Sequence, residues 1–195
     1  MLLDLLNNVL DFSKFEAGSL KLELIDFDPG QVIEDVVNLM RSLAMAKTLD
    51  LTFAAGSEMP VKIQGDPLRF RQILANLISN AIKFTNDGSV TIRGESLGRD
   101  DGAEMLLIEI EDTGIGIAVE DQGHIFEAFS QADSSVTRSY GGSGLGLTIC
   151  NQLVRTMGGE IGVKSVVGKG SIFWFTVPLM GKGGVEVKTG AVVTG

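Results

Sequence analysis

Several residue types are scarce in this 195-residue sequence, which contains one cysteine, Cys150, one histidine, His124, and one tryptophan. A single cysteine excludes an internal disulfide and a thiolate metal cluster. No apolar run reaches the ~18 residues of a membrane span, and the first residues lack the basic region and cleavage site of a signal peptide. Basic residues are also few: 16 Lys and Arg face 25 Asp and Glu, for a net charge of −9. Nucleic-acid binding normally requires a basic surface, so nucleic acid is not an expected partner.

Glycine, by contrast, is abundant, with 25 residues, and many of them lie between Gly114 and Gly170. Clustered glycine in a folded domain indicates backbone that must approach another group closely. With 44% hydrophobic and 21% charged residues, the chain is otherwise typical of a globular protein. Its length suits one domain, with or without an appendage.

Two helix-start signals, Asp28-Pro29 and Asp66-Pro67, place an N-cap Asp before a Pro in the first helical position. Together with the hydrophobic periodicity, they predict helices over 29–47 and 67–85, and a third follows over 145–157. Strand patterns cover 51–55, 61–64, 89–96, 105–112, 161–165 and 171–177, with a weaker one over 20–25. The order predicts an α+β fold: a two-layer sandwich of one mixed, mostly antiparallel sheet with helices on one face.

A polar segment over 113–143 is too long for an ordinary connection, apart from one short helical piece near 120–129. Such segments are usually functional lids, so we expect a long lid that becomes ordered with a ligand. Residues 1–18 read as a separate helix, 19–180 as the folded domain, and 181–195, which are small and Gly-rich, as a flexible tail or linker.

The helix over 67–85 carries a narrow polar stripe opposite its apolar face. At ~100° per residue, the stripe consists of Arg69, Gln72, Asn76, Asn80 and Lys83. Asparagine is a poor helix former, so two of them one turn apart suggest more than a solvated face. Asparagine oxygens suit Mg²⁺ and a Lys ammonium suits phosphate oxygens. An ordinary amphipathic helix remains the alternative.

Asp112 ends a predicted strand and is followed by Gly114 and Gly116. A carboxylate only accepts hydrogen bonds, so it would favour adenine, which carries an amino group at position 6, over guanine, which carries a carbonyl there. A tight turn with a solvated Asp is the alternative. Further on, the glycines of 141–146 open a helix, and backbone N–H groups at a helix N-terminus bind anions.

Taken together, these segments resemble the ATP-binding motifs of sensor histidine kinases. Residues 76–85, NLISNAIKFT, resemble the N box, and 112–116, DTGIG, the first glycine box. Residues 125–129, IFEAF, resemble the F box, and 142–147, GSGLGL, the second glycine box. Order and spacing match from about 26 to 179. The family belongs to an ATPase superfamily shared with DNA gyrase and a heat-shock chaperone, and the resemblance implies ATP and Mg²⁺ as ligands.

The resemblance also assigns roles to single residues. It makes Asn76 and Asn80 contacts of Mg²⁺, Lys83 a phosphate contact, and Asp112 the reader of the adenine amine. Gly114 and Gly116 would shape the base pocket, and three residues would present N–H groups to the phosphates: Gly144, Leu145 and Gly146. The remaining site residues are Phe84, Ile117, Arg138 of the lid, directed at the γ-phosphate, and Thr176, which would support the adenine through water.

Two further segments resemble parts of these kinases. Residues 6–18, LNNVLDFSKFEAG, resemble the end of the second helix of the dimerisation hairpin, whose first helix carries the phospho-acceptor histidine and is absent here. Residues 129–138, FSQADSSVTR, resemble the lid of hybrid kinases.

The resemblance also implies partners: the dimerisation helix, a second copy in a homodimer, and a receiver domain or response regulator. The implied location of the domain is the cytoplasm; membrane anchorage of the parent protein is left open.

Four single residues have simpler interpretations. His124 lies just before the F box, away from the family's acceptor helix, and we expect a structural surface residue. Phe173 and Trp174 are expected in the core of a strand, and Cys150 is expected to be packed and unreactive.

The main hypothesis is a protein histidine kinase domain that donates the γ-phosphoryl group of ATP to a histidine on the dimerisation helix. An ATPase switch, as in the gyrase relatives, is a second hypothesis, but those relatives use a Glu as general base where this chain has Asn76. A non-catalytic nucleotide sensor is the third.

Overall fold

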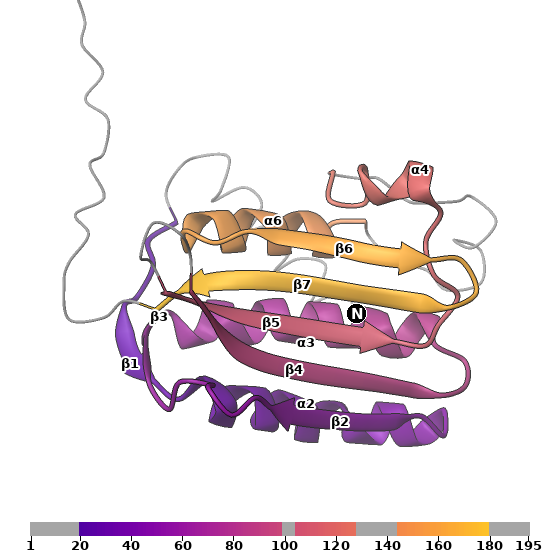
Figure 1. Ribbon diagram of the computed structural model, residues 1–195, viewed down its shortest axis with the longest axis horizontal. Helices are drawn as coiled ribbons and strands as arrows, with labels where there is room; N and C mark the ends of the chain where they lie inside the picture. Colours follow the sequence, from indigo (N-terminus) through magenta and orange to yellow (C-terminus); the bar gives the residue numbers. More distant parts are fainter. Residues whose placement is uncertain (1–19, 99–103, 128–143, 180–195) are drawn as a thin grey trace, which may run out of the picture.

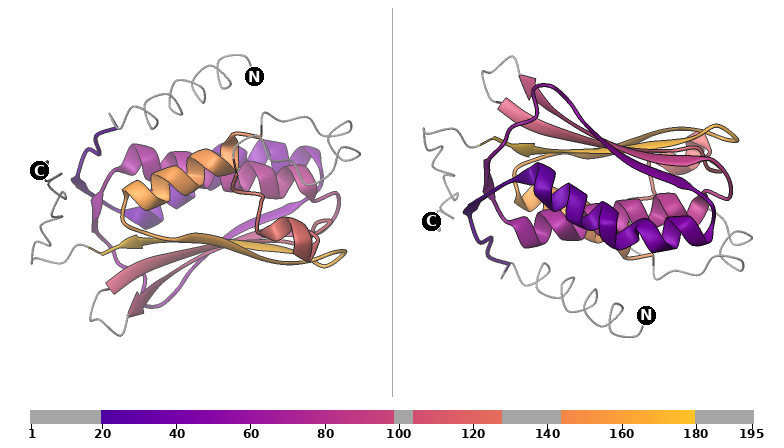
Figure 2. Two further views of the ribbon diagram at one scale, coloured as in Figure 1. Left: turned by 90° about the horizontal axis from the view of Figure 1, so that it is seen from above. Right: turned by 90° about the horizontal axis from the view of Figure 1, so that it is seen from below.

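A five-stranded sheet covered on one face by helices forms the two layers of the computed structural model, which describes residues 20–98, 104–127 and 144–179. Helices α2, α3 and α6 lie together on one side of the sheet (Figures 1 and 2). This arrangement confirms the predicted α+β sandwich. The residues expected to form the lid's centre, the N-terminal helix and the C-terminal tail fall outside the described part of the chain.

The sheet has the strand order β2-β4-β5-β7-β6. Only the β2–β4 pair is parallel, while β4–β5, β5–β7 and β6–β7 are antiparallel. The strands are β2 (Asp50–Ala55), β4 (Ser89–Gly98), β5 (Glu104–Asp112), β6 (Ile161–Val166) and β7 (Gly170–Pro178). A separate antiparallel pair joins β1 (Ile25–Phe27) to β3 (Ile63–Gly65).

Both helix-start signals act as the sequence predicts. Asp28 caps α2 (Pro29–Ala46), and its carboxylate accepts the N–H of Gln31 at 3.1 Å. Asp66 caps α3 (Pro67–Phe84) by accepting two N–H groups, at 3.0 and 3.1 Å. A side-chain acceptor at this position satisfies donors that the first helical turn leaves unpaired. The other helices among the described residues are α4 (Val119–Gln122) and α6 (Gly146–Thr156).

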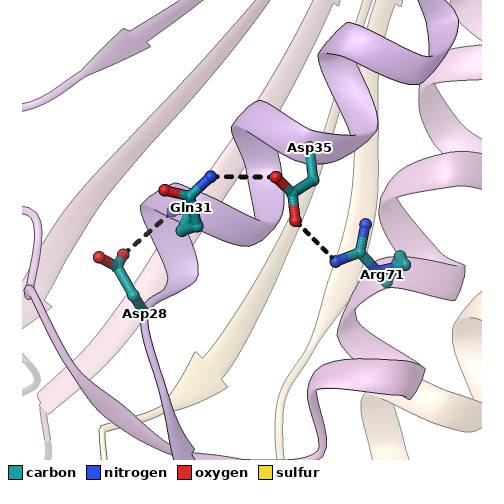
Figure 3. A network of polar contacts seen from close by, with 4 residues as sticks. All are labelled: Asp28, Gln31, Asp35 and Arg71. Carbon is teal, nitrogen blue, oxygen red and sulfur yellow. Dashed lines mark hydrogen bonds and ion pairs between the residues drawn. The ribbon is translucent and has the colours of Figure 1, made fainter.

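A polar chain links α2 to α3 on the surface (Figure 3). Gln31 donates from Nε2 to Asp35 Oδ1 at 3.0 Å, and Arg71 donates to Asp35 Oδ2 at 3.0 Å. These two bonds lower the pKa of Asp35, the bond from Gln31 more than that from Arg71. All partners are exposed, so solvent screens the pair and it contributes little to stability.

The core lies between α3 and the sheet. The apolar face of α3 is buried over its length, at Phe70, Ile73, Leu74, Leu77, Ile78, Ala81 and Ile82. The Phe70 ring packs against Phe27 and Phe175, with centroids 5.6 and 5.7 Å apart. Burial of this face leaves the predicted polar stripe of α3 outside the core. Within the described residues, no helix is long and apolar enough to span a bilayer.

Three local expectations need correction. The strand pattern over 20–25 yields only β1, Ile25–Phe27. Of the helical piece near 120–129, the residues described, which end at 127, are helical only in α4. Phe173 is buried, but Trp174 is only half-buried. Successive strand residues face opposite sides of a sheet, and Trp174 pairs with Gly162 on the face away from the helices. A Cβ on Gly162 would collide with the indole ring, so the ring lies over a glycine on the outer face.

Thr48 has a φ of 56° and is the one non-glycine residue with positive φ in the described chain. A left-handed conformation costs an L-residue roughly 1–2 kcal/mol, whereas glycine adopts it freely but orders with a penalty of about 0.5–1 kcal/mol. Thr48→Gly should therefore raise the free energy of unfolding by about 0.5–1 kcal/mol in urea denaturation. Thr48→Ala keeps the Cβ, so its free energy of unfolding should rise less. If Thr48→Gly were no more stable than wild type, the left-handed backbone at this position would not be strained.

Candidate functional site

The predicted site residues come from segments that meet at one end of the two layers. β5 ends there, the β6–β7 turn reverses there, and α4 lies beside them (Figure 1). The C-terminus of α3 is joined to the segment after β5, because Ile115 donates its N–H to Phe84 O at 3.3 Å. Most motif residues within the described chain therefore belong to one region, although their positions in the sequence are far apart.

Asp112 is a buried carboxylate at the last position of β5, with 5% of its surface exposed. Oδ1 accepts the N–H of Gly114 at 2.8 Å. Burial raises the pKa of Asp112, while backbone hydrogen bonds from Gly114 and Ser171 oppose that rise and the charge of Glu111 adds to it. Burying a polar acceptor is costly unless it has partners, so a fixed carboxylate here suits recognition of a donor group.

The two glycines after Asp112 are required by close contacts. A Cβ on Gly114 would lie 2.5 Å from Phe84 O and 2.8 Å from Asp112 Oδ1. Gly116 has a φ of +69°, which L side chains rarely adopt, and a Cβ there would lie 2.1 Å from Val166 O. The chain can pass between the end of α3 and the β6–β7 hairpin only because both residues lack side chains.

Sequence reasoning missed three polar residues that fix this segment. Ser165 Oγ accepts the N–H of Ile117 at 2.8 Å and shares a hydrogen bond with Ser171 Oγ at 2.9 Å. Gln122 donates from Nε2 to the carbonyls of Ile117 and Ser165, both at 2.9 Å. A hollow of about 440 Å³ adjoins Asp112 and is lined in part by these three residues, within the size range of small-molecule sites.

The polar stripe of α3 meets the start of α6. Asn76 Oδ1 lies 3.5 Å from the position that a Cβ on Gly146 would occupy, an ordinary van der Waals distance, so the Asn76 side chain and the first residue of α6 are neighbours. Leu145, at the N-cap of α6, makes no side-chain cap, and Gly144 before it has a φ of +69°. The amide of Asn76 thus lies beside a helix N-terminus, the kind of end that binds anions.

Further along the stripe, Asn80 and Lys83 are both half-buried. Burial lowers the pKa of Lys83, and its Nζ lies 4.9 Å from the centroid of the Phe84 ring. The stripe therefore offers amide oxygens and an ammonium on one side of a single helix.

Cys150 and His124 behave as expected from the sequence. Cys150 is fully buried against α3, where burial raises its pKa to about 12 and a hydrogen bond with the Asn76 side chain opposes the rise. A thiol needs its thiolate form to react, so Cys150 is packed and inert. His124 is exposed, and its Nδ1 lies 2.9 Å from Glu127 Oε1; that contact raises its pKa.

One site assignment does not join the cluster, and another concerns a residue outside the described part of the chain. Thr176 pairs with Leu107, whereas Ser171 pairs with Asp112. Five strand residues, about 17 Å at roughly 3.3 Å each, separate Thr176 from Ser171, and the odd spacing places its side chain on the opposite face. Thr176 instead accepts the N–H of Glu160 at 3.0 Å, so its assignment to the adenine site was wrong; Ser171 lies where that assignment required. Arg138 falls outside the described residues.

The chain is similar to a known protein family and to solved structures. Residues 65–181 match the family described as histidine kinase-, DNA gyrase B-, and HSP90-like ATPase. Sensor protein GacS from Pseudomonas syringae pv. syringae is 46% identical over 178 residues, which cover 91% of this chain and 20% of GacS. The signal transduction histidine-protein kinase BarA from Escherichia coli K12 is also 46% identical over 178 residues, 91% of this chain and 19% of BarA.

Two solved structures show the same fold. Full-length ShkA in complex with AMPPNP has a TM-score of 0.79 and 37% identity, covering 91% of this chain and 35% of ShkA. The histidine kinase AdeS of Acinetobacter baumannii has a TM-score of 0.73 and 25% identity, covering 91% of this chain and 78% of AdeS. The chain spans about a fifth of the length of the curated relatives named above.

Proposed function

Because this chain belongs to the family of histidine kinase-, DNA gyrase B-, and HSP90-like ATPases, we propose that it binds Mg·ATP and donates the γ-phosphoryl group to a histidine in two-component signalling. The observation that carries the proposal is Asp112, a buried carboxylate followed by two glycines that close contacts require. Its relatives GacS and BarA are named as sensor and histidine-protein kinases, and ShkA was solved with the ATP analogue AMPPNP.

At the adenine end, Asp112 accepts a hydrogen bond from the 6-amino group of the base. Gly114 and Gly116 keep the neighbouring backbone free of side chains, so a flat base can lie against it, and Ile117 borders the same segment. Guanine would oppose a carbonyl oxygen to the carboxylate, which leaves two acceptors facing each other. The site therefore selects adenine over guanine through the charge of Asp112 and not through the size of the base.

At the phosphate end, the side chains fit a magnesium–phosphate group. The amide oxygen of Asn76 lies beside the N-terminus of α6 at Gly146, so a hard-cation ligand and an anion-binding helix end are neighbours. Asn80 adds a second amide oxygen, Lys83 an ammonium, and Phe84 packs against that ammonium. When bound, Mg²⁺ supplies charge neutralisation at the phosphate oxygens.

Phosphoryl transfer to an imidazole fits these residues better than hydrolysis does. A water molecule needs a general base, and Asn76 cannot take up a proton. A ready imidazole needs mainly positioning and charge neutralisation. This favours a kinase over an ATPase switch. The presence of every proposed phosphate-binding and metal-binding side chain on α3 favours a kinase over a non-catalytic sensor.

The remaining proposals concern the whole protein. We propose that residues 1–18 belong to the dimerisation hairpin, 19–180 to the catalytic domain and 181–195 to a linker. The partners would then be the histidine-bearing helix, a second copy in a homodimer, and a receiver domain or response regulator. The relatives include a protein named hybrid signal transduction histidine kinase B from Dictyostelium discoideum, 41% identical over 177 residues. The proposed location of the domain is the cytoplasm.

Calorimetry with non-hydrolysable nucleotides tests this function. The chain should bind AMPPNP in the presence of Mg²⁺ and bind GMPPNP about 100-fold more weakly or worse, because a misplaced acceptor leaves the buried charge of Asp112 without its partner. Removing Mg²⁺ with EDTA should lower the affinity for AMPPNP. Equal affinities for the two nucleotides would remove the proposed role of Asp112, and no binding of either would overturn the function.

A further inference from the structure

Lys47 lies outside all four nucleotide-binding motifs, yet its side chain ends at the site's central helix. Its Nζ donates to three backbone carbonyls at the C-terminus of α3: Ile82 O at 2.9 Å, Lys83 O at 2.7 Å and Thr85 O at 3.1 Å. An ammonium has three N–H donors, and three carbonyl contacts match that number.

Helix chemistry explains why a cation is stable there. The last carbonyls of an α-helix have no partner within the helix, and this end carries the negative pole of the helix dipole. Lys47 is itself anchored, because it caps α2 and its backbone N–H donates to Ala44 O at 3.0 Å. One side chain therefore joins the end of α2 to the end of α3.

The clamped carbonyls belong to the segment that carries site residues. Lys83 is the proposed phosphate contact, and the next residue, Phe84, accepts the N–H of Ile115 at 3.3 Å. Thr85 is fully buried and donates from Oγ1 to Ala81 O at 2.7 Å. The last turn of α3 is thus fixed by Lys47 on one side and by the first glycine box on the other.

We propose that Lys47 is a positioning residue of the nucleotide site: it holds the C-terminal turn of α3 so that Lys83 and the Gly114–Ile115 segment keep the geometry that nucleotide binding requires. The inference rests on the proposed function. Lys47 acts through backbone carbonyls and not through contact with the nucleotide.

The expected effect follows from losing that clamp. Lys47→Met removes the three donors and leaves half-buried carbonyls to find other partners, which displaces Lys83 and loosens the bond between Phe84 and Ile115. Changing a residue that orients a metal ligand typically costs 10–100-fold in metal affinity or activity, and Lys47 orients a phosphate contact in the same indirect way. We therefore expect the affinity for AMPPNP with Mg²⁺ to fall about tenfold. Lys47→Arg should recover most of it, because a guanidinium also donates to several acceptors.

Two controls separate positioning from general damage. Lys62→Met makes the same chemical change at an exposed lysine that pairs with Asp26 at 3.2 Å, and it should leave affinity unchanged. Val37→Ala destabilises α2 through its buried face without touching the end of α3. All variants are measured at a temperature where circular dichroism shows each of them to be folded.

Amide hydrogen exchange supplies a local readout. The Ile115 N–H should exchange faster in Lys47→Met than in wild type, Lys62→Met or Val37→Ala, with AMPPNP affinity falling in parallel. If Lys47→Met lowers stability yet binds AMPPNP as tightly as wild type, the residue is merely structural and the inference is overturned. If wild type itself binds no nucleotide, the proposed function fails instead, so the two failures are distinguishable.

Discussion

Replacing Asp112 with asparagine should weaken the binding of ATP by about 2–4 kcal/mol, because a buried charged acceptor loses its charge where a nucleotide donor requires it. At 1.4 kcal/mol per factor of ten, this is a loss of roughly 30- to 1,000-fold in affinity. The asparagine oxygen can still accept the N–H of Gly114, which now reaches Oδ1 at 2.8 Å, so the fold should be retained. Isothermal titration calorimetry with AMPPNP and Mg²⁺ measures the change.

Glu109→Gln is the matched control for this experiment. Glu109 is a partly exposed carboxylate three residues before Asp112 on the same strand, and it faces the other side of the sheet, where it pairs in register with Arg93. Its replacement should change the affinity little. If Asp112→Asn kept wild-type affinity while remaining folded, Asp112 would be removed from the adenine site, whatever the family resemblance implies.

Local signals account for the parts of the fold that the sequence predicted well. Asp28-Pro29 and Asp66-Pro67 act over three residues, through a carboxylate that caps its own helix, so no knowledge of the rest of the chain is needed. The apolar face of α3 could likewise be predicted from the helical spacing of its hydrophobic residues. Asp112, Gly114 and Gly116 could be singled out because they lie within five residues of one another and because glycine is the residue type that lets backbone approach another group closely.

Contacts between distant segments account for what the sequence did not reveal. Ser165 bonds Ile117 from 48 residues away, and Lys47 reaches carbonyls 35 to 38 residues further on. Neither belongs to a motif. Thr176 was misassigned because the register of β7 against β5 decides which residue faces Asp112, and one strand's composition does not fix that register. The prediction that Trp174 is a core residue failed for a related reason. Consecutive residues of β7 are apolar, so its sequence shows no alternation that would mark the outward-facing positions.

The strongest test of the kinase hypothesis concerns where the phosphoryl group goes. His124 is the single histidine of these 195 residues; it is exposed and lies 2.9 Å from Glu127 in the turn after α4. A histidine acceptor must approach the γ-phosphate in line, and nothing in the described structure directs His124 toward the polar stripe of α3. Hydrolysis is also disfavoured, because Asn76 replaces a general base whose absence typically costs about 10²–10⁴ in rate.

Incubation of the chain with γ-labelled ATP and Mg²⁺ should therefore give no label on His124 and hydrolysis near background. Adding the histidine-bearing dimerisation hairpin of a sensor kinase as a separate protein should produce label on that hairpin, at a rate that rises with its concentration because no linker keeps the partners together. The label should be acid-labile and base-stable, and Asp112→Asn should suppress it at sub-saturating ATP. Acid-labile label on His124 without the hairpin would overturn the interpretation of this chain as a donor, and rapid ATP hydrolysis would favour the ATPase switch.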